Sequence, residues 1–167
     1  MLDVAVQHAA VWPVLDEAGW DDLATDAVRA ALEANAIAID GRTIEVSLRL
    51  TDDAEVQQLN RQFRGKDRPT NVLSFPMDDA DDAGPGEWML GDMVLARETC
   101  VAEAAEKGIS VTDHASHLIV HGTLHLLGHD HLDDATAEAM EALETKILAS
   151  LGIANPYRLP DDQPTGG

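Results

Sequence analysis

Histidine residues gather in one short stretch of this sequence. Six of the seven lie between His114 and His131. Three of them, His121, His125 and His131, follow the spacing His-x3-His-x2-Gly-x2-His. Side chains four residues apart on an α-helix are separated by about 40° around the axis and roughly 6 Å along it. The first two imidazoles of the pattern can therefore reach one metal ion from the same face of a helix.

The glycine in this pattern, Gly128, explains how the third histidine can join the other two. Glycine accepts the left-handed backbone that ends many helices, so the chain can turn back and present His131. Three imidazoles with one open coordination position are typical of a catalytic zinc site. We therefore predict one metal ion held by His121, His125 and His131. Zinc fits this set best, and nickel, copper or iron are alternatives because imidazole binds all of them.

The same spacing is the ligand framework of the metzincin peptidases. In those enzymes a general-base Glu follows the first histidine, whereas this chain has Gly122 at that position. Peptidase chemistry of that type therefore lacks its proton acceptor. We expect a metal-dependent hydrolase of another kind and keep peptide hydrolysis as an alternative.

Two further polar residues lie close to the predicted ligands. His117 precedes His121 by one helical turn, and Asp130 directly precedes His131. His117 can hydrogen-bond a ligand, face the substrate or be a structural residue, and the structural role is favoured. Asp130 can accept a hydrogen bond from the free N–H of a ligand imidazole, although an exposed turn residue is an equal alternative.

The charge of the chain restricts its partners. Acidic residues number 31 against 11 basic ones, which gives a formal net charge of −20. Such a surface repels nucleic acids and anionic membranes at long range. The exception is a group of four basic residues within eight positions, Arg61, Arg64, Lys66 and Arg68. This group is the one part of the sequence that favours a phosphate-bearing ligand.

Length and composition indicate one soluble domain. The 167 residues, 45 % of them hydrophobic, are enough for one core, and we predict a single catalytic domain at residues 1–154 with a loose tail at 155–167. No apolar run is long enough to cross a bilayer, and the first residues lack the charges of a secretory signal. The single cysteine, Cys100, excludes an internal disulfide. We expect a cytoplasmic protein.

Hydrophobic periodicity and turn residues predict the elements that position these groups. Strands are expected at residues 2–6, 43–50, 71–75 and 88–95. Helices are expected at residues 21–35, from Thr51 or Asp52 to Gly65, at residues 97–107, from Thr112 or Asp113 to Gly128, and from Asp133 or Asp134 to about residue 151. On the second helix, Val56, Leu59 and Phe63 fall on one apolar face. The order is not a strict alternation and predicts an α+β fold, a small mixed β-sheet flanked by helices.

Three segments carry a resemblance to a known family. Residues 121–131, His-Gly-Thr-Leu-His-Leu-Leu-Gly-His-Asp-His, resemble the signature His-Gly-x-Leu-His-Leu-x-Gly-[aromatic or His]-Asp-His of the YbeY endoribonucleases. Residues 64–75, Arg-Gly-Lys-Asp-Arg-Pro-Thr-Asn-Val-Leu-Ser-Phe, are similar to that family's Arg-Gly-Lys-Asp-x-Pro-Thr-Asn-Val-Leu-Ser-Phe segment. Residues 90–92 are similar to its Leu-Gly-Asp strand. The three segments lie in family order, and the resemblance covers roughly residues 40–150.

The resemblance implies both a site and an activity. His121, His125 and His131 match the family's metal ligands, and Arg64 matches its functionally important arginine. The implied activity is cleavage of single-stranded RNA in ribosomal RNA maturation, especially at the small-subunit 3′ end, and in ribosome quality control. The implied partners are single-stranded ribosomal RNA and the ribosome or its associated proteins.

The chemistry of a phosphodiester gives Arg64 a role of its own. A phosphodiester under attack gains charge on its oxygens, and a guanidinium can hold two of them at once. His121 and Arg64 are therefore the predicted catalytic residues, and Arg61 and Lys66 can contact neighbouring phosphates. Phe75 is expected in the core, although an aromatic ring near the site could stack on a base. A non-enzymatic ribosome-assembly factor with a structural metal is the remaining alternative.

Overall fold

A single mixed sheet forms the centre of the computed structural model, which describes residues 1–37, 41–77, 87–128 and 134–156. Its strands are β1 (Leu2–His8), β2 (Thr43–Thr51), β3 (Val72–Pro76) and β4 (Glu87–Ala96). Their order across the sheet is β1-β2-β4-β3, in which β1, β2 and β4 run parallel and β3 runs antiparallel to β4. This arrangement confirms the predicted α+β fold with a small mixed sheet.

Five helices accompany the sheet in the described part of the chain. They are α1 (Glu17–Ala34), α2 (Asp53–Arg64), α3 (Arg97–Lys107), α4 (Val111–Leu126) and α5 (Asp134–Ser150). None of them, within the described ranges, is long and apolar enough to cross a membrane. The predicted ligand His131, its neighbour Asp130 and residues 157–167 of the predicted tail lie outside the described residues.

Helix ends follow the local signals in some places and depart from them in others. The Asp52 side chain accepts a hydrogen bond from the Glu55 N–H at the start of α2, and Gly65 ends that helix with φ of 71°, as predicted. The predicted start of α4 at Thr112 or Asp113 is wrong. Ser110 is the N-cap, and its hydroxyl accepts from the Asp113 N–H at 3.1 Å.

The start of α1 was also misplaced by the sequence pattern. The helix begins at Glu17, four residues before the predicted start, and Asp16 caps it by accepting from the Gly19 N–H at 2.8 Å. Trp20 in this first turn is buried in the core. Burial of a large aromatic side chain therefore extends the helix through a glycine that weakens its local propensity.

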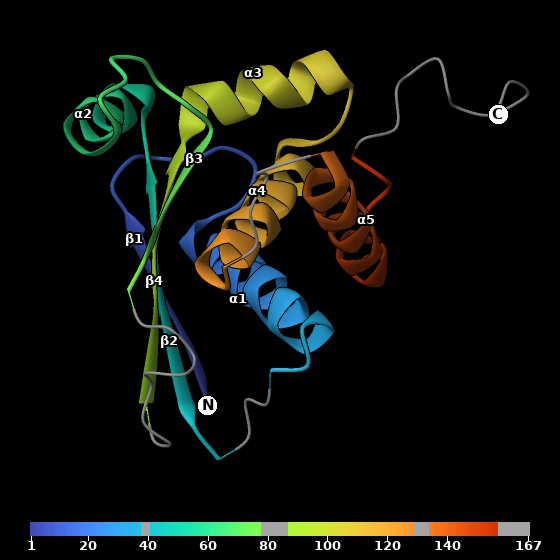
Figure 1. Ribbon diagram of the computed structural model, residues 1–167. Coiled ribbons are helices and arrows are strands. Elements are labelled where there is room, and N and C mark those ends of the chain that lie inside the picture. Colours follow the sequence, from blue (N-terminus) through green and yellow to red (C-terminus); the bar gives the residue numbers. More distant parts are fainter. Residues whose placement is uncertain (38–40, 78–86, 129–133, 157–167) are drawn as a thin grey trace, which may run out of the picture.

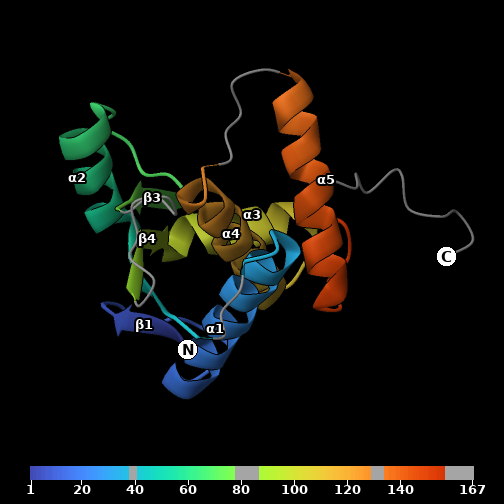
Figure 2. The ribbon, with the colours of Figure 1, turned by 60° about the horizontal axis from the view of Figure 1, so that its bottom comes forward.

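The sheet divides the molecule into two unequal layers. Figure 1 and Figure 2 show α1, α4 and α5 on one side of the sheet and α2 on the other. On the side of α2, a small apolar cluster joins Val56 to Leu73, Val94 and Ala96. The main core lies on the opposite side, between the sheet and α4.

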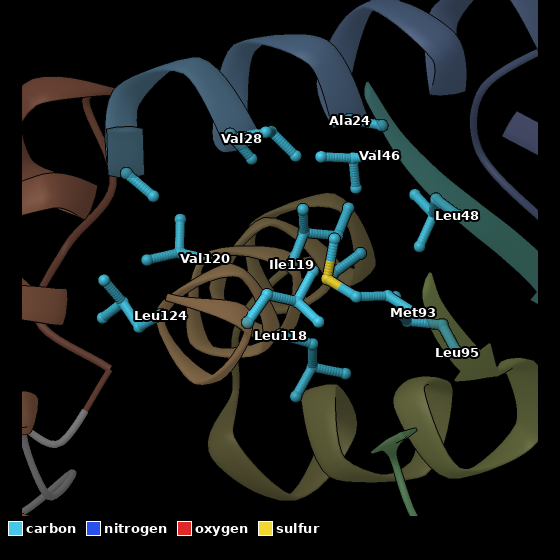
Figure 3. Close-up of a cluster of buried hydrophobic side chains, with 14 of the residues drawn as sticks. Ala24, Val28, Val46, Leu48, Met93, Leu95, Leu118, Ile119, Val120 and Leu124 are labelled. Carbon is cyan, nitrogen blue, oxygen red and sulfur yellow. The ribbon is translucent and has the colours of Figure 1, made fainter. Parts of the chain in front are cut away.

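The main core encloses α4 on nearly all sides. Figure 3 shows its residues Leu118, Ile119, Val120 and Leu124 between α1 and the strands β2 and β4. The packing partners labelled there are Ala24, Val28, Val46, Leu48, Met93 and Leu95. A helix that is packed over most of its surface has little freedom to shift, so the polar side chains that it carries are held in position.

Candidate metal centre and cleft

Four of the described histidines form a row along α4. The ring centroids of His114 and His117 are 6.0 Å apart, those of His117 and His121 are 6.3 Å apart, and those of His121 and His125 are 4.5 Å apart. Burial decreases along the row, because His114 and His117 are buried whereas His121 and His125 are half-buried. The row therefore runs from the core to the surface of a cleft.

His121 and His125 come together as the helical spacing requires. Their Nε2 atoms are 2.9 Å apart, and both residues line a cavity of about 730 Å³. Gly128, which also lines this cavity, has the left-handed φ of 97° that the sequence pattern predicted. The third predicted ligand, His131, lies beyond this turn and outside the described residues.

Glu144 on α5 supports His121 from behind. Its side chain is fully buried, and its Oε1 is hydrogen-bonded to His121 Nδ1. Its Oε2 lies 3.7 Å from His117 Nε2. A hydrogen bond at Nδ1 leaves Nε2 of His121 to face His125 and the cavity. This is the usual way in which a carboxylate fixes the orientation of a metal-binding histidine.

Sequence reasoning missed Glu144, although a signal for it exists. Glu144 follows Met140 by four residues and precedes Ile147 by three, and both neighbours are buried on the core face of α5. A charged residue in the middle of an apolar helix face must have a partner, because an unpaired buried carboxylate is costly. The spacing indicates this requirement without saying which residue satisfies it.

The structure offers two places for an ion around His121. One ligand atom each from His117, His121 and Glu144 lie within 4.8 Å of one another, so this cluster could hold a metal. It lies in the core, where Glu144 and His117 leave little access for water. The other place is on the Nε2 side, between His121 and His125, and opens into the cavity.

Access decides which of these places suits catalysis. A catalytic ion keeps an open coordination position for substrate or water, whereas a structural ion is enclosed by its ligands. The Nε2 side of His121 meets this requirement, with Glu144 hydrogen-bonded to the opposite nitrogen. The pair of imidazoles is a donor set that fits zinc and similar divalent ions.

Position 122 shows why the general base of the peptidases has no counterpart here. A Cβ atom on Gly122 would lie 2.6 Å from Met93 Sδ and 3.0 Å from Ser74 Oγ. The Ser74 hydroxyl donates to the Gly122 carbonyl at 3.3 Å. A side chain at this position would have to displace Met93 and Ser74, so close packing between α4 and the sheet disfavours the Glu of the peptidases here.

The opposite wall of the cleft comes from the end of α2 and from β3. Arg64 lines the cavity together with Phe63 and Phe75, and Asn71 and Ser74 complete that wall. Arg64 is exposed, as are its basic neighbours Arg61, Lys66 and Arg68. Within the described residues, none of these four cations has an ion-pair partner. The cationic rim, as we name these four residues, is therefore available to an anionic ligand.

A partly buried hydrogen-bond network holds the β3 side of the wall. His114 Nε2 is bonded to Glu103 Oε1 at 2.8 Å, and Asn71 Nδ2 donates to the same oxygen at 3.0 Å. The Asn71 Oδ1 accepts from the Val72 N–H at 2.7 Å. Burial lowers the pKa of His114 below its ordinary value, although the bond to Glu103 opposes this effect. A neutral His114 thus anchors a cleft residue through Glu103.

Comparison with known proteins places this site in a family. The profile of the family described as endoribonuclease YbeY matches residues 8–152. A protein of that name from Sphingopyxis alaskensis is 57 % identical over 166 residues, which cover 94 % of this chain and 98 % of that protein. Another, from Rhizorhabdus wittichii, is 54 % identical over 171 residues, covering 97 % of this chain and 100 % of that protein.

A solved structure shows a similar fold. The solution structure of a Thermotoga maritima protein matches this one with a TM-score of 0.54 at 25 % sequence identity, covering 90 % of this chain and 89 % of that chain. The family profile and the two relatives, each more than 50 % identical to this chain, show that the chain belongs to the endoribonuclease YbeY family.

Proposed function

We propose that this protein is a metal-dependent endoribonuclease that cleaves single-stranded RNA during ribosomal RNA maturation. The observation that carries the proposal is the cavity that brings His121 and His125 opposite Arg64. Membership of an endoribonuclease family supports it. The proposed substrate region is the 3′ end of the small-subunit RNA, with a further role in ribosome quality control. The proposed location is the cytoplasm, with the ribosome or ribosome-associated proteins as partners.

The proposed ligands are His121, His125 and His131, and the proposed ion is one zinc. The 2.9 Å separation of the first two Nε2 atoms and the left-handed turn at Gly128 support this set. Zinc in such a site supplies a Lewis acid that polarises a phosphoryl oxygen and activates water. Glu144 keeps the His121 ring in the orientation that presents Nε2. The same carboxylate also holds His117 near the ligands, which gives His117 a supporting role.

Arg64 is the proposed phosphate-binding residue. Its guanidinium is planar and can donate to two phosphate oxygens, which stabilises the charge that develops as the phosphodiester is attacked. Arg61 and Lys66 are placed to hold adjacent phosphates of the same strand. Because the chain carries a net charge of −20, RNA binding is confined to the cationic rim.

One experiment separates this function from its alternatives. Wild-type protein and the His121→Ala variant, both quantified for bound metal, are incubated with single-stranded ribosomal RNA and with casein. We expect RNA cleavage by the metal-loaded wild type, no cleavage of casein, and loss of both metal and activity in His121→Ala. Cleavage that persists in metal-depleted His121→Ala would reveal a contaminating nuclease. Intact RNA together with a stability loss on chelation would instead support a structural metal.

A further inference from the structure

Phe63 is a large aromatic residue left open to solvent. It is 60 % exposed, whereas Val56 on the same helix face is buried and Leu59 is half-buried. The three residues were predicted to share one helix face, and Phe63 is the member of that face that is open to solvent. No other aromatic side chain among the described residues is exposed to this degree. Exposed apolar area is unfavourable in water, so a binding role is a natural explanation.

The ring of Phe63 is held in place although it is exposed. It meets Phe75 on β3 edge to face, with ring centroids 5.5 Å apart and an interplanar angle of 66°. A contact of this geometry fixes the orientation of a ring through one of its sides. With more than half of its surface exposed, Phe63 keeps a broad face open. The ring is thus a flat, oriented platform.

The position of Phe63 links this platform to the reactive part of the cleft. Phe63 lines the 730 Å³ cavity together with His121, His125 and Arg64. It also lines a neighbouring cavity of about 460 Å³ on the α2 side of the sheet, so it forms a ridge between the two. In sequence it is flanked by Arg61 and Arg64, whose side chains have no ion-pair partner among the described residues.

We propose that Phe63 stacks against the RNA base next to the phosphate that Arg64 holds. Sites for single-stranded nucleic acid combine cations for the backbone with aromatic rings for the bases. In a duplex both faces of a base are covered by its neighbours and cannot stack on a protein ring. A platform of this kind therefore favours unpaired RNA. Stacking accepts any base, so the platform selects single strands rather than a sequence. The inference rests on the proposed function, because it names the contact that positions the substrate of that same site.

The test compares variants at position 63 on intact and abasic RNA. The substrate is a single-stranded RNA with one mapped cut, and a matched set carries an abasic residue at each position around that cut. We expect Phe63→Ala to raise KM by roughly 5- to 150-fold with a smaller change in kcat, the range that corresponds to loss of one stacked base. Phe63→Trp should retain wild-type KM, and Phe63→Leu, which keeps the apolar bulk, should resemble Phe63→Ala.

The abasic substrates distinguish stacking from a structural effect. With the abasic residue next to the cut, the KM of the wild type should rise to the value that Phe63→Ala has on intact RNA. The KM of Phe63→Ala should be the same on both RNAs. Val101→Ala, which trims another exposed apolar side chain on α3, is the control and should cleave both RNAs as wild type does. If Phe63→Ala and Phe63→Leu match wild type, or if Phe63→Ala loses the same factor on both RNAs, the platform is disproved.

A binding measurement separates failure of this inference from failure of the proposed function. In Phe63→Trp, single-stranded oligouridine should quench the new tryptophan fluorescence, whereas an abasic ribose-phosphate chain of equal length should not. The native tryptophans Trp12, Trp20 and Trp88 are buried, so the wild-type signal provides the baseline. If the wild-type protein cleaves no RNA, the proposed function is disproved. If oligouridine and the abasic chain quench equally, or neither quenches, the inference about Phe63 is disproved.

Discussion

The two walls of the cleft carry their polar side chains in opposite environments. On the α4 wall, His114 is bonded to Glu103 and His121 to Glu144, within or at the edge of the core. On the α2 wall, the cationic rim is exposed, and none of its members has an ion-pair partner among the described residues. One wall is held by internal hydrogen bonds, and the other keeps its donors available to a ligand.

This difference follows from what each wall has to do. A metal site needs ligands whose orientation is set before the ion arrives, so each ring requires a partner on its second nitrogen. A phosphate contact needs donors that are not already neutralised, because displacing an internal carboxylate would reduce the gain from binding. In a chain with 31 acidic residues, a group of cations without ion-pair partners among the described residues is therefore a specific feature of the fold.

Removal of Glu144 should have the largest effect on the α4 wall. Replacing it with Ala leaves His117 and His121 without their buried partner, and we expect a loss of about 3–5 kcal/mol in the free energy of unfolding. Metal affinity should fall by about 10- to 100-fold. Urea denaturation and metal titration measure the two effects. Glu138→Ala, on an exposed position of the same helix, is the control, and equal stability of the two variants would contradict the pairing.

Removal of Arg64 should affect activity without affecting the fold. Loss of one donor to a developing oxyanion costs about 100- to 1000-fold in rate, and we expect Arg64→Ala to fall in that range. Its thermal unfolding and bound metal should remain those of wild type, because Arg64 is exposed. Arg61→Ala is the matched control on the same helix and should lose about tenfold or less. A similar loss in both variants would mean that the rim acts only through its total charge.

A side chain at position 122 should move the α4 wall away from the sheet. In Gly122→Ala the new Cβ would contact Met93 Sδ and Ser74 Oγ, and we expect a loss of about 1–3 kcal/mol in stability. Met93→Val removes the closer contact. In the Met93→Val background, Gly122→Ala should therefore lower the stability less than it does in the wild-type protein. Denaturant unfolding of the wild type, the two single variants and the double variant measures the coupling between positions 93 and 122. If the two losses in stability simply add, the contact with Met93 is not the cause of the Gly122→Ala loss.

Features with a local cause were predictable from the sequence. The end of α3 at Gly108 and the cap residues of α2 follow from turn and capping residues within a few positions of one another. The approach of His121 to His125 follows from the helical repeat alone. The start of α4 was misplaced because Ser110, Thr112 and Asp113 are all good N-caps, and only the packing of the helix selects among them.

Features that depend on distant parts of the chain were not predictable in the same way. Glu144 reaches His121 from a different helix, 23 residues further along the chain, so no spacing rule joins them. The exposure of Phe63 depends on which parts of the chain pack against α2, which the periodicity of that helix does not encode. Sequence patterns thus indicated which residue types lie on each wall, whereas tertiary packing decides which of them are paired and which are open.

The smallest expected effect concerns the pH dependence of the α4 wall. Burial is the main cause that lowers the pKa of His114, the nearby Lys107 acts in the same direction, and the bond to Glu103 opposes both. In the unfolded chain His114 takes up a proton near pH 6.5, whereas in the folded protein it does so only at lower pH. The free energy of unfolding therefore decreases as the pH falls below 6.5. The loss amounts to at most about 1.4 kcal/mol per pH unit for one proton.

Replacement of His114 by Gln tests this sign. The amide can still donate to Glu103 but does not titrate, so the acid-side loss of stability below pH 6.5 should become shallower by up to one proton. Urea unfolding midpoints of both proteins, measured from neutral pH down to about one unit below the ordinary histidine pKa, give the two slopes. Parallel slopes would show that His114 takes up its proton as readily in the folded protein as in the unfolded chain. The α4 wall would then tolerate a positive charge at His114, because the bond to Glu103 would offset the cost of burying it.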